Sequence, residues 1–191
     1  MRSVLRKRLS SDSGITLIEL MIYIALGAVV ISVVGSVMIQ SFRVQDSVQT
    51  SNSATGDGQL VIASIQTGVR NASVLSMSST SDGELLIART NNSAGAVSCK
   101  YRAWYYASAG TGSIYTKSSA TAITAPTTSA ALSTWTRLTT GVSRSGTTAI
   151  FATSAQQVDV RFNVAVRDSN PVPFKTTIIS RGTTLESYQC S

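Results

Sequence analysis

The chain has no histidine and few charged residues. None of its 191 residues is His, and Asp, Glu, Lys and Arg together make up only 13% of them. Histidine is the commonest general base and metal ligand, and the carboxylates are scattered among Gly and Ser without metal-binding spacing. No GxSxG motif or Gly-rich phosphate loop is present either. The composition therefore predicts a protein that is not an enzyme and holds no metal ion or cofactor.

Cysteine is also scarce. Cys99 and Cys190 are the two cysteines of the chain, and they do not form a CxxC motif. If the body of the protein lies outside the cytoplasm, a disulfide between them is expected. Such a bridge would close a loop of roughly 90 residues and would stabilise the fold by about 4–5 kcal/mol in the chain-entropy model. The alternative is two separate buried thiols.

What the chain does have is a long apolar run near its amino terminus. Residues 15–39 carry a single charge, on Glu19. As a helix they would extend roughly 37 Å, which is enough to cross a hydrocarbon core of about 30 Å. The basic residues that precede the run predict that its amino end stays cytoplasmic and that the rest of the chain is exported; they are Arg2, Arg6, Lys7 and Arg8.

Small residues recur within this run. Ala28, Ser32 and Ser36 lie at four-residue intervals, so they share one face of a helix. Small residues on one face let apolar helices approach closely. The spacing favours a helix that packs among other helices, although Gly and Ser also occur in simple single-span anchors.

The position of Gly14 distinguishes the run from an ordinary secretory signal. Such a signal is cleaved at a small-residue site after its apolar core, whereas Gly14 precedes the core. The order of basic leader, glycine and apolar run resembles the type IV prepilin leader, whose pattern after the glycine is Phe-Thr-Leu-Ile-Glu-Leu. Here the corresponding residues are Ile15, Thr16, Leu17, Ile18, Glu19 and Leu20, so Ile15 replaces the usual Phe.

The resemblance implies processing and assembly. In the family, a membrane aspartyl protease, the prepilin peptidase, cuts after the glycine and methylates the new amine, which here is that of Ile15. Glu19 then pairs with the positive amino terminus of a neighbouring subunit, which offsets the desolvation of both charges and sets the register between subunits. The alternative is that Glu19 lies at the cytoplasmic edge of a simple anchor.

The resemblance also implies a function. The chain is similar to minor pilins and J-type pseudopilins, which serve type IV pili or type II secretion filaments in initiation, tip or accessory roles. Its partners would be other pilin subunits and the assembly machinery. It would cross the inner membrane once, with a cytoplasmic amino terminus, before entering a pilus or pseudopilus at the cell surface. The alternatives are a competence-type pilin that contacts DNA and a single-span protein with an exported binding domain.

One group of aromatic and cationic residues could support the DNA-binding alternative. Aromatic residues lie beside two cations, and together they could form a base-stacking platform; the residues are Lys100, Tyr101, Arg102, Trp104, Tyr105 and Tyr106. Packing in the core or at the edge of a strand is the commoner use of such aromatic residues, and we favour it.

We expect an α+β fold in which a long amino-terminal helix packs on an antiparallel β-sheet head, as in pilins. Its segments are a cleaved leader (1–14), a membrane-spanning and filament-core helix (15–39), an amphipathic continuation (40–76) and an exported β-rich head (77–191). Apolar residues at helical spacing define the continuation, and they are Val44, Val48, Ile62, Ile65, Val69 and Ala72. Gly56 and Gly58 predict a bent or melted turn within it.

Short β-rich segments follow in the head. They are Glu84–Arg89, Ser98–Ala107, Ser113–Lys117, Thr147–Ala152, Gln157–Arg167 and Phe174–Arg181. Gln157–Arg167 alternates most regularly, which predicts a half-buried strand. Residues 168–171 suggest a turn into its antiparallel partner, and the Ser/Thr/Ala-rich segment 118–134 suggests a flexible surface loop.

Overall fold

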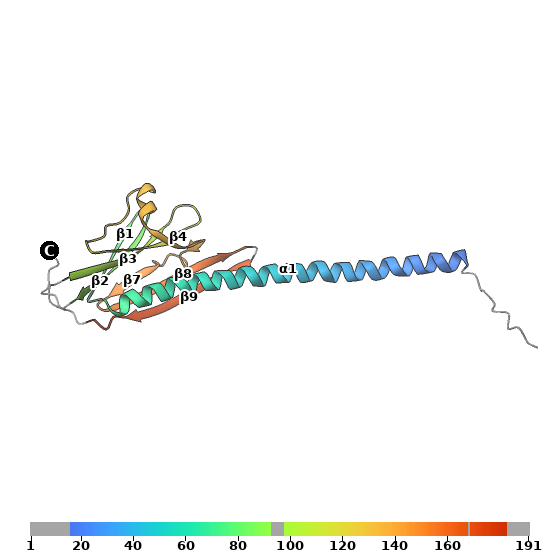
Figure 1. Ribbon diagram of the computed structural model, residues 1–191, viewed down its shortest axis with the longest axis horizontal. Coiled ribbons are helices and arrows are strands. Elements are labelled where there is room, and N and C mark those ends of the chain that lie inside the picture. Colours follow the sequence, from blue (N-terminus) through green and yellow to red (C-terminus); the bar gives the residue numbers. More distant parts are fainter. Residues whose placement is uncertain (1–15, 93–97, 168, 183–191) are drawn as a thin grey trace, which may run out of the picture. The chain divides into compact units, whose positions relative to one another are not determined.

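The computed structural model describes residues 16–92, 98–167 and 169–182. These residues form one long α-helix, nine strands and one short 3-10 helix (Figure 1). Helix α1 spans Leu17–Arg70, and the 3-10 helix η1 spans Ala130–Thr134. The chain divides into two compact units, Met1–Asp46 and Ser47–Ser191. The first part of α1 belongs to the amino-terminal unit, and its last part belongs to the head.

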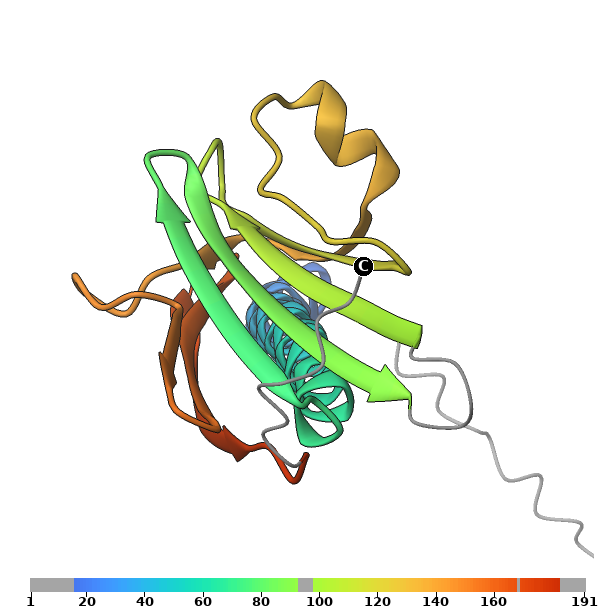
Figure 2. The ribbon, with the colours of Figure 1, turned by 90° about the vertical axis from the view of Figure 1, so that its left-hand side faces the viewer.

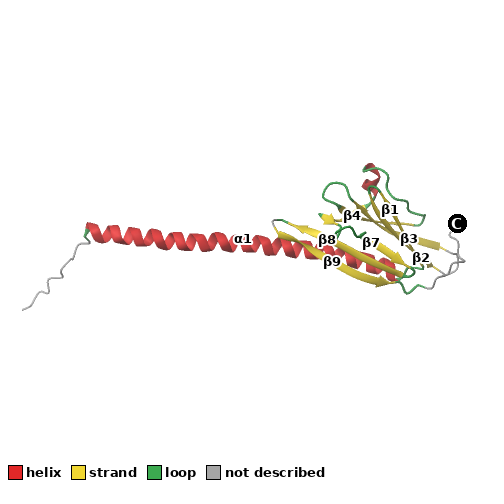
Figure 3. Cartoon of the chain, turned by 180° about the vertical axis from the view of Figure 1, so that it is seen from behind, coloured by secondary structure: helices red, strands yellow, loops and turns green. Residues whose placement is uncertain are grey.

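The strands of the head form two antiparallel sheets (Figure 3). The larger sheet has the order β1-β2-β3-β4-β5. In the smaller sheet β8 is central, with β6 and β7 along one edge and β9 along the other. The strands are β1 (Val74–Thr80), β2 (Gly83–Asn92), β3 (Ser98–Ala107), β4 (Ser113–Ser119), β5 (Thr136–Thr140), β6 (Val142–Ser143), β7 (Phe151–Ser154), β8 (Gln157–Val166) and β9 (Ser169–Ile179).

The last part of α1 lies between the two sheets, as the view along the helix in Figure 2 shows. Its buried residues recur every three or four positions and therefore form one stripe; they are Ala54, Gly58, Val61, Ile65 and Val69. Side chains from both sheets join the stripe in one core, and the largest fully buried ones are Trp104, Phe151, Phe162, Ile65, Leu86 and Ile114. Complete burial of an aliphatic side chain stabilises the fold by about 1.5–3 kcal/mol, so the head depends on this end of α1.

Two glycines allow α1 to approach the sheets closely. A Cβ atom at Gly58 would overlap the ring of Phe174 in β9, and one at Gly68 would overlap the ring of Trp104 in β3. Phe174 in turn stacks on Phe162 of β8, with ring centroids 5.1 Å apart. The glycines therefore admit the two aromatic rings against the helix, and α1 continues through Gly58 without interruption.

A second hydrophobic cluster lies on the other face of the five-stranded sheet. It contains Leu85, Tyr105 and Trp135, and the rings of Tyr105 and Trp135 are 6.1 Å apart. The segment between β4 and β5 covers this face, as Figure 2 shows, and buries Ile123 there. The expected surface loop is therefore also a cover for this cluster.

A buried carboxylate joins the two sheets. Glu84 of β2 is only 1% exposed. Its Oε2 accepts hydrogen bonds from the backbone N–H groups of Ile150 (2.7 Å) and Phe151 (3.0 Å), at the start of β7. Its Oε1 accepts one from Nε of Arg144 at 2.8 Å. The guanidinium of Arg144 also lies 5.7 Å from the ring centre of Tyr106. Burial raises the pKa of the Tyr106 hydroxyl, although Arg144 opposes this effect.

The end of β9 is tied to the end of α1. The N–H of Arg181 donates to the carbonyl of Arg70 at 2.9 Å, and the hydroxyl of Ser180 donates to the carbonyl of Ala72. Gly182 lies so close to Ala72 that a Cβ atom there would overlap its carbonyl. The first of these bonds satisfies a backbone carbonyl that the helix end leaves without an intrahelical partner, and the second satisfies the carbonyl of Ala72, just beyond the helix.

The α+β class and the long helix packed on antiparallel strands are confirmed. So is the alternation of Gln157–Val166, in which every second residue is buried. The turn expected at residues 168–171 was placed too late, because β9 already pairs with β8 from Ser169. Residues 183–191 lie outside the described part of the chain.

Other boundaries were wrong. The helix ends at Arg70 and not at residue 76, because Val74–Thr80 pairs with β2 instead. Val44 and Val48 are 57% and 53% exposed and do not extend the buried stripe. The expected bend near Gly56 and Gly58 is absent from α1, since packing outweighs the weak helix propensity of glycine. The head also contains two sheets where one was expected.

The two helix glycines provide a matched test of close packing. Gly58→Ala should destabilise the head by about 1–3 kcal/mol, because the added methyl group must displace Phe174. Gly56→Ala should stabilise it by up to about 1 kcal/mol, because nothing lies within 4 Å of that Cβ position and alanine favours the helix. Thermal unfolding of both variants checks the prediction, and equal effects would contradict it.

The buried carboxylate gives a second test. Glu84→Ala should destabilise the head by about 2–5 kcal/mol, since it leaves two buried backbone N–H groups without their acceptor, whereas water can solvate the partly exposed Arg144. Asp82→Ala, at an exposed position in the adjacent turn, should change stability by less than about 0.5 kcal/mol. Denaturant unfolding measures both effects. A Glu84→Ala protein as stable as the Asp82→Ala protein would show that the carboxylate does not hold the sheets together.

Candidate functional site

The amino-terminal part of α1 exposes its apolar side chains in the part of the chain that the structure describes. Its large hydrophobic residues from Leu17 to Ile39 are each 52–74% exposed. The helix is long and apolar enough to span a membrane, by length and composition. Because a helix that is hydrophobic on all sides needs an apolar environment, lipid or other helices must cover this surface.

Thr16 caps the start of the helix. Its hydroxyl oxygen accepts a hydrogen bond from the N–H of Glu19 at 3.3 Å, and its carbonyl accepts one from the N–H of Leu20 at 3.1 Å. Thr16 is therefore the N-cap residue, and Glu19 is the third residue of the helix. The Thr-x-x-Glu spacing is that of a capping box. Sequence reasoning assigned Thr16 only to the motif and missed this role, although the spacing carries the signal.

Glu19 has a hydroxyl partner and no cationic partner among the described residues. Its Oε1 accepts a hydrogen bond from the Tyr23 hydroxyl, one turn along the helix, at 2.9 Å. In the part of the chain that the structure describes, no cation forms an ion pair with Glu19, in contrast to Glu84, which pairs with Arg144. The helix dipole favours a carboxylate in the first turn, but only a cation would neutralise it. Glu19 thus presents a negative charge at the start of an apolar helix.

The predicted packing face has hydroxyl groups that need no neighbour. Ser32 donates to the carbonyl of Ala28 at 2.8 Å, and Ser36 donates to that of Val33 at 2.7 Å. Bonds of this kind satisfy a hydroxyl inside its own helix, so it can enter hydrocarbon without another partner. The face therefore consists of small side chains whose hydroxyl groups are already hydrogen-bonded within the helix. Its role in helix packing stays a prediction.

The remaining predicted residues divide as follows. Leu17, Ile18 and Leu20 lie in the exposed first turn of α1. Gly14 and Ile15 lie outside the described residues, so the cleavage site has no structural description. Cys99 lies in β3 and is 8% exposed. Cys190, like Gly14 and Ile15, lies outside the described part. The disulfide therefore stays a prediction.

The aromatic cluster of β3 packs inside the head. Trp104 and Tyr106 face the main core, while Tyr101 and Tyr105 face the second cluster. Trp104, Tyr105 and Tyr106 are at most 6% exposed, and Trp104 Nε1 donates to the hydroxyl of Ser64 at 3.0 Å. The packing interpretation is confirmed, and these three rings cannot stack on bases. No group of side chains suited to a metal ion occurs in residues 16–92, 98–167 and 169–182.

Comparison with known families agrees with this geometry. Residues 9–35 match the prokaryotic N-terminal methylation motif. The matched segment includes Gly14, the Thr16 cap, Glu19 and most of the apolar run. No curated protein and no solved structure matches the chain.

The fold is pilin-like, with a long amino-terminal helix on antiparallel strands. The chain carries the methylation motif, which is consistent with a type IV prepilin-like protein. Together with the apolar helix, the motif supports a membrane-anchored, single-pass protein. It also implies processing by a prepilin peptidase and assembly with other pilins.

The cap can be tested at Thr16. Thr16→Ala should accelerate amide hydrogen exchange of Glu19 about fivefold, because a lost cap costs about 1 kcal/mol. Thr16→Ser keeps the hydroxyl and should exchange at nearly the wild-type rate. NMR-detected exchange of the protein in detergent micelles measures both. Equal acceleration in the two variants would show that the hydroxyl does not cap the helix.

Proposed function

We propose that the chain is a minor pilin or pseudopilin, a subunit of a type IV pilus or type II secretion filament with an initiation, tip or accessory role. The observation that carries the proposal is the exposed apolar start of α1, with Glu19 as its one carboxylate and no cationic partner among the described residues. A helix of this kind is suited first to lipid and then to a bundle of identical or related helices.

Processing prepares the helix for assembly. The peptidase would cut between Gly14 and Ile15, on the cytoplasmic side of the apolar run, so that the mature protein keeps its anchor. The new amine of Ile15 would lie one turn before Glu19. Because the basic leader holds the amino end inside, the head would fold on the outer side of the membrane.

Assembly would then supply the missing cation. An unpaired charge costs about 2.5–3.5 kcal/mol at the centre of a bilayer on insertion scales, and less toward its edge, where the first turn of α1 would lie. The Tyr23 hydroxyl satisfies part of the carboxylate's hydrogen-bonding capacity, and the amino terminus of Ile15 in a neighbouring subunit would neutralise its charge. Such a pair fixes the axial offset between two helices that otherwise present only apolar side chains.

Two alternatives make different predictions. A competence-type pilin would bind DNA in a salt-sensitive manner, but burial of Trp104, Tyr105 and Tyr106 removes the expected stacking surface. A single-span protein with an exported binding domain would not need an amine next to Glu19. The identity of the mature amino terminus and the effect of changing Glu19 therefore distinguish the proposal from both.

The first test concerns processing. Mass spectrometry of protein purified from membranes should find a chain that begins with N-methylated Ile15. Gly14→Val should accumulate the precursor, since the bulky side chain blocks cleavage. A wild-type chain that keeps the residues before Ile15 would contradict the processing step.

The second test concerns Glu19. Both Glu19→Ala and Glu19→Gln should reduce incorporation into filaments roughly tenfold or more, because each leaves the neighbouring amine without its counter-ion. Asp82→Ala removes a carboxylate from the head and should assemble normally. Immunoblots of sheared filaments against membrane fractions measure incorporation at equal membrane levels. Normal incorporation of Glu19→Gln would show that the charge is not required.

A further inference from the structure

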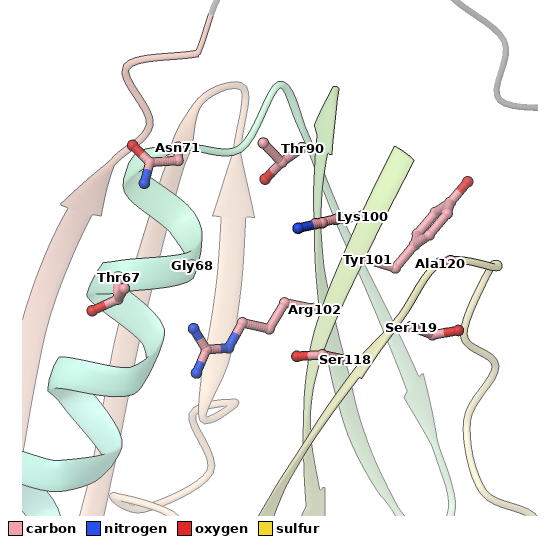
Figure 4. A pocket seen from close by; sticks show the side chains of 10 residues that line it. All are labelled: Thr67, Gly68, Asn71, Thr90, Lys100, Tyr101, Arg102, Ser118, Ser119 and Ala120. Carbon is pink, nitrogen blue, oxygen red and sulfur yellow. The ribbon is translucent and has the colours of Figure 1, made fainter. Parts of the chain in front are cut away.

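The head contains an open cavity that the proposed function does not use. It has a volume of about 620 Å³ and lies between the last turn of α1 and the strands β2, β3 and β4. Figure 4 shows Lys100 and Arg102 pointing from β3 toward α1, while Tyr101 points to the other side of the sheet. Residues 100 and 102 share one face because side chains alternate along a strand.

Within the described part of the chain, no carboxylate neutralises the two cations. None of the described residues that line the cavity is acidic. Neither Lys100 nor Arg102 forms an ion pair with a described residue, in contrast to Arg144, which pairs with Glu84. Two like charges on one face of a strand repel each other, and an anion between them would remove that repulsion.

Arg102 is held in place by contacts that leave its charge available. Its guanidinium carbon lies 5.7 Å from the ring centre of Trp104, whose ring is completely buried. Its Nε is buried and has no hydrogen-bond partner in the described part of the protein. A buried donor of this kind has lost its water without gaining an acceptor. Because this nitrogen is buried, a ligand in the cavity would meet the terminal nitrogens of the guanidinium instead.

Further donors converge on the same space. The side chains of Asn71, Thr90 and Ser118 line the cavity, and Figure 4 shows them around the two cations. An amide, two hydroxyls, an ammonium and a guanidinium can all donate hydrogen bonds. Thr67 differs from them, because its hydroxyl already donates to the carbonyl of Ala63 at 2.8 Å.

We propose that this cavity binds the phosphate or sulfate group of a small anionic ligand. A tetrahedral oxyanion has several acceptor atoms, which suit the convergent donors better than a single carboxylate does. Arginine recognises such groups through paired, charge-assisted hydrogen bonds. The volume also exceeds that of an inorganic ion and lies in the range of small-molecule sites, so the ligand is an ester whose uncharged part occupies the remaining space.

The proposal is tested by titration of the full chain in detergent micelles. Inorganic phosphate, glucose 6-phosphate and glucose are added at constant ionic strength, and amide shifts are followed by NMR. Glucose 6-phosphate should cause saturable shifts at residues 67–71, 90, 100–102 and 118, and it should bind more tightly than phosphate. Glucose should cause none. Phosphate binding as tight as that of the ester would overturn the inference of an ester ligand.

Three variants locate the site. Lys100→Gln and Arg102→Gln should each weaken glucose 6-phosphate binding about tenfold, the effect of losing one charge-assisted hydrogen bond. Lys175→Gln removes an equal charge from β9, outside the cavity, and should bind normally. Because Lys100 is exposed, its variant should keep the wild-type thermal unfolding midpoint. Equal weakening by Lys175→Gln would show a general charge effect and would overturn the proposal.

One more measurement distinguishes a small ligand in the cavity from a bound nucleic acid. A single-stranded oligonucleotide is titrated under the same conditions and in competition with glucose 6-phosphate. Binding of the oligonucleotide without saturable binding of glucose 6-phosphate would overturn the proposal in favour of a nucleic-acid surface. These readouts do not depend on filament assembly, so they can fail or succeed independently of the proposed subunit role.

Discussion

The architecture of the head depends on one buried carboxylate. Glu84 belongs to the five-stranded sheet, yet it accepts hydrogen bonds from Ile150 and Phe151 at the edge of the other sheet. Without Glu84, these two buried N–H groups would be desolvated and unpaired, and the partly exposed guanidinium of Arg144 would lose its counter-ion. Apolar contacts are tolerant of small displacements, whereas this set of hydrogen bonds is satisfied in one arrangement only. The carboxylate therefore determines how the sheets meet, and their arrangement forms the slot that α1 occupies.

The parts of the fold that follow from local periodicity could be predicted from the sequence. The alternation of Gln157–Val166 and the apolar run of α1 are properties of neighbouring residues, and both were identified. The contribution of Gly58 could not be predicted, because its cause is an aromatic ring more than a hundred residues away. The same holds for Val74–Thr80, whose conformation follows from pairing with β2. Within the candidate site, Glu19 was evident from its motif, whereas its Tyr23 partner became evident only from the geometry of the helix.

Two parts of the molecule carry charges of opposite sign without a partner of the other sign among the described residues. At the start of α1, the single carboxylate of Glu19 lies among apolar side chains and has no cationic partner in the described part of the chain. In the cavity beside the end of α1, Lys100 and Arg102 have no carboxylate partner in the described head. The first arrangement suits an interaction inside the membrane, and the second suits an interaction with a solute outside it. In such a protein, the start of α1 would serve assembly and the cavity in the head would serve ligand binding.

The ties between β9 and the end of α1 have a mechanical consequence. Residues 180–182 meet residues 70–72, and further back along both segments Phe174 of β9 lies against Gly58. Strand and helix therefore run in the same direction, side by side. Tension along α1 would load these contacts together, in shear, and would not separate them one after another. A subunit built in this way resists extension well, because many weak contacts must break at the same moment before the helix can slide out of its head.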